Sequence, residues 1–131
     1  MTVDELTENF ALFDEWEDRY RYIIELGKTL PPMDDGLKTA ETKVEGCTSQ
    51  VWFVPLKSED GTFRFLGDSD AHIVRGLIAI LFVMATGKTA DELAAFDFEA
   101  HLADLGLDEH LSPSRTNGLY AMVKRLRSFA A

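Results

Sequence analysis

Residues 51–66 read VWFVPLKSEDGTFRFL, and this stretch sets the class of fold. Two apolar runs, Val51–Leu56 and Thr62–Leu66, flank Ser58–Gly61, whose composition is typical of a hairpin turn ending on glycine. A short strand near Thr42–Val44 precedes them. The pattern predicts a three-stranded antiparallel meander. Because the first apolar run is nearly continuous, we expect both faces of that strand to be covered.

Helical patterns stand on both sides of this hairpin. Each predicted helix shows at least one of three signals: a residue that can cap the first turn, a proline at the first position, or an apolar stripe along one face. They begin at Thr2 with Glu5, at Trp16, at Ser69 or Asp70, at Thr89–Glu92 and at Ser112–Pro113, with further short turns over Asp97–Leu107. The segment Ile73–Met84 is apolar nearly all round, which predicts a central buried helix. We therefore predict one α+β domain over residues 1–131, a small three-stranded antiparallel sheet packed against several helices.

The composition narrows the partners and the compartment. The formal net charge of −10 would repel nucleic-acid phosphates and anionic lipids, so neither is an expected partner. A single cysteine argues against a disulfide-stapled secreted domain. Met1–Leu12 is acidic and does not have the pattern of a signal peptide, and the apolar stretch Gly76–Ala85 is too short to cross a bilayer. We expect a cytoplasmic protein.

The single cysteine, Cys47, lies in the run VEGCTSQVW over residues 44–52. Gly46 precedes it and two hydroxyl residues follow it, which is the composition of a loop. A lone thiol forms no intramolecular disulfide and cannot alone hold a metal or an iron–sulfur cluster. One sulfur can still accept, carry and hand over a covalently bound group. The residues alone leave open whether Cys47 is reactive or an inert loop residue.

Arg115 is the second candidate. It lies in the first turn of the last predicted helix, where a cation opposes the helix dipole and an acidic residue would be more stabilising. A positive charge within reach of Cys47 would lower the pKa of the thiol and raise its thiolate fraction.

Other titratable residues give weaker signals. His72, His101 and His110 match no metal-ligand spacing, and no second cysteine is present to complete a mixed site. Asp68 and Asp70 suggest paired carboxylates, but Asp70 is explained more simply as a helix cap. The chain also lacks a glycine-rich phosphate loop. We therefore expect no metal and no resident cofactor.

Four motifs run in order over nearly the whole chain: Trp16–Tyr20 with Leu26–Gly27 and Leu30–Pro32, then Val44–Trp52, then Gly67–Asp70 with Ile73–Leu77, then Leu111–Arg115 with Gly118–Leu119. Together they resemble the SufE family of sulfur acceptors, which work with cysteine desulfurases in iron–sulfur cluster assembly. The resemblance implies an α+β fold with a small antiparallel sheet. It also implies that Cys47 accepts a persulfide, that Arg115 lies near its loop, and that Gly46, Ser49 and Gln50 shape the loop.

The implied function is sulfur transfer by an accessory protein rather than by a stand-alone enzyme. Cys47 would take persulfide sulfur from a SufS-type desulfurase, stimulate it, and pass the sulfur to a cluster scaffold; a CsdA-type desulfurase is the alternative partner. Pyridoxal phosphate is expected only on the desulfurase. Because an exposed carrier thiol would be oxidised, we expect Cys47 to be tucked against apolar residues until the protein docks.

Two other functions stay open, as does formation of a homodimer. The chain is alternatively a regulatory binding module that stimulates a desulfurase without carrying sulfur. An iron–sulfur scaffold is least favoured, because it would need several thiolate ligands and the chain has one cysteine.

Overall fold

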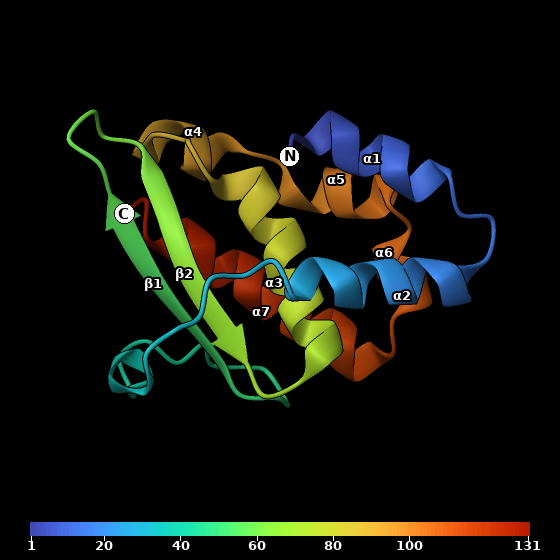
Figure 1. Cartoon of the computed structure of the whole chain (residues 1–131). Helices are drawn as coiled ribbons and strands as arrows, with labels where there is room; N and C mark the ends of the chain where they lie inside the picture. Colours follow the sequence, from blue (N-terminus) through green and yellow to red (C-terminus); the bar gives the residue numbers. More distant parts are fainter.

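The computed structural model describes all 131 residues and places the predicted hairpin against a long buried helix (Figure 1). Strand β1 (Val51–Lys57) pairs with β2 (Phe63–Ser69) in antiparallel register, with Val51 opposite Ser69 and Lys57 opposite Phe63. The turn closes where it was predicted, since the Gly61 N–H donates to the Ser58 carbonyl at 2.9 Å. Helix α3 (His72–Ala85) follows β2 directly and packs across the inner face of the hairpin.

The sheet has two strands, so the prediction of a three-stranded meander is wrong. The segment 42–44 lies beside the start of β1, but it forms only an isolated bridge between Lys43 and Trp52. The Phe53 N–H donates outward to the Thr42 carbonyl at 2.9 Å. Two residues further along β1 the next outward position is Pro55, which has no N–H to donate. The pairing therefore cannot continue, and this edge of β1 stays short.

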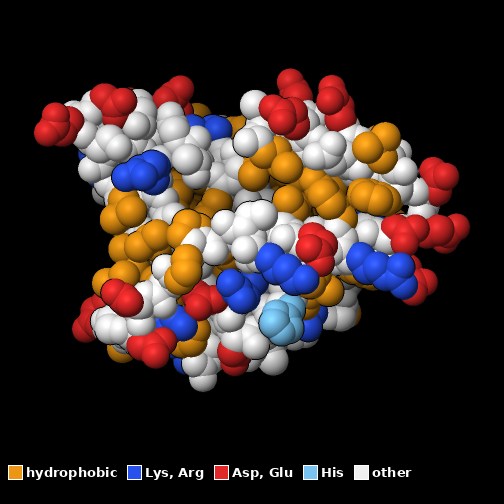
Figure 2. Space-filling view, in the orientation of Figure 1, with side chains coloured by type: hydrophobic (Ala, Val, Ile, Leu, Met, Phe, Trp, Pro, Cys, Tyr) orange, Lys and Arg blue, Asp and Glu red, His pale blue; other side chains and the backbone are white.

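The two faces of the hairpin differ in burial. Val51, Phe53 and Phe65 on the inner face are buried against α3 and neighbouring helices. On the outer face, Trp52 and Val54 are only half-buried, so the prediction that both faces are covered is wrong. The short 3₁₀ helix η1 (Asp35–Leu37), the residue after it and the chain that leads from α2 into η1 cover part of this face, and hydrophobic side chains lie open on this side of the molecule (Figures 1 and 2).

Helix α3 forms the centre of the fold, as its all-round apolar sequence predicted. Ten of its residues are buried, and Leu77, Ile78 and Met84 have no exposed surface. The other helices surround it (Figure 1). They are α1 (Val3–Ala11), α2 (Trp16–Gly27), α4 (Ala90–Ala95), α5 (Phe98–Asp104), α6 (Leu107–His110) and α7 (Pro113–Ser128). None of the helices combines the length and the hydropathy needed to cross a membrane.

Three of the predicted helix starts are confirmed by their hydrogen bonds. The Thr2 hydroxyl accepts from the Glu5 N–H at 3.1 Å. Thr89 and Glu92 form the complete reciprocal capping box, in which each side chain accepts from the backbone of the other. The Ser112 hydroxyl accepts from the backbone N–H of Arg115 at 3.3 Å, which fixes the first turn of α7.

Helices α2 and α3 meet through glycines. A Cβ atom added at Gly76 would lie 2.1 Å from the carbonyl oxygen of Ile23, and one at Gly27 would lie 2.7 Å from the backbone nitrogen of Gly76. The two backbones therefore approach more closely than any side chain at these positions would permit. This crossing holds α2 against the helix whose first turn borders the cysteine loop.

Candidate functional site

Cys47 lies on a loop that rests on the start of α7. Its side chain is half-buried, and its Sγ donates to the Gly118 carbonyl at an Sγ–O distance of 3.5 Å. The neighbouring hydroxyl of Thr48 bonds to the hydroxyl of Ser114 at 2.6 Å. Gly46 precedes the cysteine at φ +93°, and a Cβ there would lie 3.1 Å from the side chain of Ala121. Position 46 thus requires a left-handed backbone conformation, which glycine adopts without steric cost.

The other end of the loop is tied to the start of α3 by Asp70. The Gln50 N–H donates to Asp70 Oδ1 at 3.1 Å, and the Asp70 N–H donates back to the Gln50 carbonyl at 3.3 Å. The interpretation of Asp70 or Ser69 as the helix cap is wrong, because the N-cap is Ala71 and makes no side-chain capping bond. The local sequence favoured a cap, but the partner of Asp70 lies 20 residues away.

A cavity of about 150 Å³ opens beside the thiol. Its walls come from the cysteine loop, α3 and α7, with apolar side chains from the helices and hydroxyl groups from the loop and the start of α7. The lining consists of Cys47, Thr48, Ser49, Val74, Leu77, Ser112, Ser114, Arg115, Gly118, Leu119 and Met122. The expected setting of Cys47 against apolar residues is present, with polar groups added around it.

The structure brings Arg115 and Cys47 to this one cavity, although they are far apart in the sequence. The Arg115 side chain forms no ion pair and no hydrogen bond with another side chain. Burial raises the pKa of the Cys47 thiol. Burial is the cause of this shift, and a lowering of the pKa by a nearby cation does not overcome it in this closed arrangement.

The remaining sequence candidates differ in their contact with the loop. Ser49 lines the cavity, and Gln50 supplies the backbone pairing with Asp70. The histidines do not enter the cavity: His101 stacks on Phe96 and His110 stacks on Trp16, while His72 is exposed. No group of three or more His, Cys, Asp or Glu side chains is placed to hold a metal ion.

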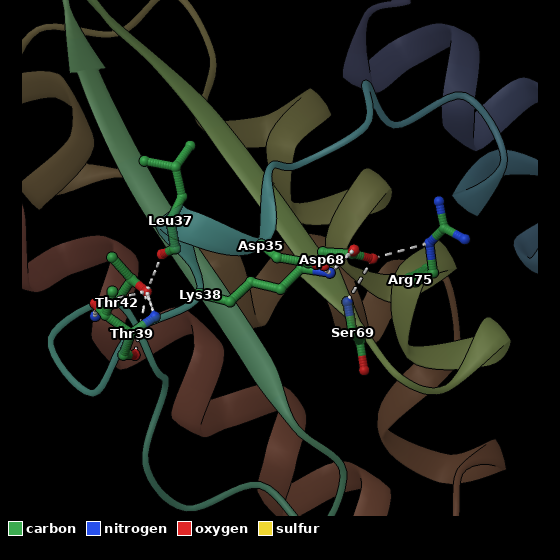
Figure 3. A network of polar contacts seen from close by, with 8 residues as sticks. All are labelled: Asp35, Leu37, Lys38, Thr39, Thr42, Asp68, Ser69 and Arg75. Carbon is green, nitrogen blue, oxygen red and sulfur yellow. Dashed lines mark hydrogen bonds and ion pairs between the residues drawn. The ribbon is translucent and has the colours of Figure 1, made fainter.

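A polar network behind the loop fixes the end of β2 just before Asp70 (Figure 3). Asp68 contacts Lys38 Nζ at 3.0 Å and Arg75 Nε at 3.2 Å, and it accepts from the Ser69 N–H at 2.8 Å. Burial pushes the pKa of Asp68 upward, but the Lys38 and Ser69 hydrogen bonds and the two cations together hold the pKa below its ordinary value. Sequence reasoning did not find this network, because its members come from β2, α3 and the residue after η1, which are far apart in the sequence.

We predict that Asp68→Asn makes the protein less stable near neutral pH and less sensitive to acid. The folded state binds the Asp68 proton more weakly than the unfolded chain does. The resulting stabilisation is present above the unfolded-state pKa of about 3.9 and is lost as the pH falls through the lower folded-state pKa. Tm measured between about pH 7 and about pH 2 should show a decrease of a few degrees at neutral pH for Asp68→Asn and a shallower acid limb. An exposed control, Asp104→Asn, should follow the wild-type curve.

Comparison with known proteins shows to which family the chain is related. Residues 4–130 match the family model of SufE, described as the Fe-S metabolism associated domain. An uncharacterized SufE-like protein of Rhizobium meliloti is 49% identical over 98% of this chain and 94% of its own length. Another, from Rhizobium etli, is 50% identical over 98% of this chain and 89% of its own length. The solution structure of a hypothetical protein from Thermus thermophilus has the same fold, with a TM-score of 0.76, 20% identity and coverage of 99% of this chain and 96% of that one. The chain therefore belongs to the SufE family and is associated with Fe–S metabolism.

Proposed function

We propose that this protein accepts sulfur from a cysteine desulfurase as a persulfide on Cys47, stimulates the desulfurase, and delivers the sulfur to an iron–sulfur scaffold. The observation that carries the proposal is the setting of Cys47. The single thiol of the chain lies on a loop, at the wall of a cavity, with the unpaired guanidinium of Arg115 on the same cavity. Membership of the SufE family supports the link to Fe–S metabolism.

The transfer step is a thiol–disulfide type of exchange. The Cys47 thiolate attacks the outer sulfur of the persulfide held by the desulfurase. A new S–S bond forms at Cys47 Sγ, the S–S bond to the donor cysteine breaks, and the donor leaves as a thiolate. The electron pair moves from the Cys47 sulfur to the donor sulfur, so no external oxidant or reductant is needed.

The closed loop explains why transfer would depend on docking. In the free protein, Cys47 is half-buried, its thiol donates to Gly118, and burial raises the pKa of the thiol. Attack requires a thiolate with a free approach to its target. Docking that turns the loop outward would remove the burial and bring the thiol to the donor sulfur, where proximity replaces a rare bimolecular encounter.

The proposed transfer also implies a cofactor on the desulfurase and two kinds of partner. Release of sulfur from free cysteine is the work of pyridoxal phosphate on the desulfurase, and the proposed role of this chain needs no cofactor of its own. A SufS-type desulfurase is the first partner to test and a CsdA-type the second. The recipient of the sulfur is a cluster scaffold.

Intact-mass measurement tests the proposal directly. The protein is incubated with each desulfurase, pyridoxal phosphate and cysteine, and the expected product carries one added sulfur that maps to the peptide containing Gly46–Gln50. Omitting cysteine should abolish the adduct. If no desulfurase of either type produces it, the carrier function is wrong.

Arg115→Ala should slow the chemistry of Cys47 while leaving the fold intact. Alkylation proceeds through the opened loop, where the thiolate is no longer desolvated and Arg115 can stabilise it, so loss of the cation should slow alkylation by iodoacetamide near neutral pH by roughly threefold to tenfold, the range for one partly screened charge. Little change in Tm is expected, because a cation in the first turn of α7 opposes the helix dipole. Lys124→Ala, which removes an exposed cation from the same helix, is the control. Unchanged alkylation together with a large decrease in Tm would mean that Arg115 is structural.

A further inference from the structure

The cysteine loop is held on α7 by two contacts whose spacing matches the helix. Cys47 and Thr48 are consecutive in the loop, and their partners Gly118 and Ser114 are four residues apart on α7. Positions i and i+4 lie one above the other on one face of a helix. The loop therefore lies along one helix face, and the Thr48–Ser114 bond holds the backbone of Cys47, one residue away, against that face.

The two contacts differ in strength and in access. The bond from Cys47 Sγ to the Gly118 carbonyl is long, at 3.5 Å, and a thiol is a weak donor. The bond between the Thr48 and Ser114 hydroxyls is 2.6 Å, and both residues are exposed. The stronger of the two contacts thus lies at the surface, where water or a docking partner can compete for the hydroxyl groups.

We infer that Thr48 and Ser114 are positioning residues that form a hydroxyl latch holding Cys47 in its closed setting against α7 until the latch is broken. This inference rests on the proposed function only in giving the latch its purpose, because its effect on Cys47 is a property of the free protein. Opening the latch leaves the weak thiol contact as the only hydrogen bond from Cys47 or Thr48 to α7. The cysteine then reaches solvent or a bound desulfurase, and the effect of burial on its pKa decreases.

Iodoacetamide alkylation of the free protein as a function of pH tests the latch. Thr48→Val and Ser114→Ala each remove one of the two hydroxyl groups with little change in shape. Each should speed alkylation about threefold to tenfold, the range that the loss of one hydrogen bond of ordinary net strength allows. The apparent pKa of Cys47 should move down toward its ordinary value of ~8.5. If Thr48 and Ser114 only stabilised the fold, the two variants would lower Tm without changing the apparent pKa of Cys47.

Three further variants make the result specific to the pair. The double variant Thr48→Val/Ser114→Ala should alkylate no faster than either single variant, because both substitutions remove the same bond. Thr48→Ser keeps a hydroxyl and should behave as the wild type. Thr7→Val, at an exposed threonine of α1 whose hydroxyl donates to the Val3 carbonyl, is the matched control and should change nothing.

Wild-type alkylation rates in both single variants would overturn the latch, as would rate increases that add in the double variant. No desulfurase takes part in this measurement, so the test remains decisive if sulfur transfer is not found. If the sulfur adduct forms on Cys47 but the single variants alkylate normally, the carrier function stands and the latch alone is wrong.

Discussion

Replacing Cys47 with Ser is expected to abolish sulfur acceptance and to return the turnover of the desulfurase to the rate of that enzyme alone. Serine keeps the size of the side chain and can still donate to the Gly118 carbonyl, so the loop should stay closed and Tm should change little. The serine hydroxyl has no sulfur atom and therefore cannot become a persulfide. The desulfurase would then have to clear its own persulfide without help, at its unstimulated rate, because this protein has no second thiol to accept the sulfur.

Binding and turnover must be measured together to interpret this variant. Cys47→Ser should bind the desulfurase with the wild-type affinity in a titration, while alanine production from cysteine shows no stimulation. Full stimulation by Cys47→Ser would contradict the carrier function and favour the regulatory binding module. If Cys47→Ser lost both binding and stimulation, a thermal melt would show whether the variant is folded. If it is unfolded, Cys47→Ala would be used in its place.

Local patterns predicted most of the elements. The hairpin turn at Ser58–Gly61, the side-chain cap at Thr2, the capping box at Thr89 and the start of α7 at Ser112 all rest on residues within a few positions of one another. The central helix was predicted because its sequence is apolar all round, which only a buried position satisfies. Such signals need no knowledge of the tertiary structure.

Long-range partners explain what the sequence did not predict. Asp70 has the composition of a helix cap, but it binds the loop at Gln50 instead, since β2 ends beside that loop. The prediction of a third strand was wrong because Pro55 ends the outward pairing. The prediction of a fully covered outer face was wrong because η1 and the chain beside it cover only part of that face. Arg115 was selected from an unfavourable charge at a helix start, and the structure places it on the cavity of Cys47.

Gly76 has a further role that the sequence conceals, because a glycine inside a helix is ordinarily a site where alanine stabilises. Alanine in place of an interior helical glycine is worth about 1 kcal/mol by propensity. At Gly76, however, the added Cβ would lie 2.1 Å from the Ile23 carbonyl oxygen and 2.5 Å from Ile23 Cγ2. A backbone carbonyl in α2 cannot rotate away from it, so the two helices must separate.

We therefore expect Gly76→Ala to destabilise the protein by about 3 kcal/mol or more, the upper range for overpacking, because steric overlap exceeds the gain in propensity. Urea unfolding measures the change. Gly36→Ala is the matched control, since a Cβ there meets nothing within 4 Å and its effect should stay within about 0.5 kcal/mol. Gly27→Ala, on the other side of the same crossing, should destabilise in the same direction, because its Cβ would lie 2.7 Å from the Gly76 nitrogen. If Gly76→Ala were as stable as the wild type, α2 and α3 would have to lie further apart than described. The chain just before α3, where Asp70 is bonded to the Cys47 loop, would then owe its position to the sheet rather than to the helix crossing.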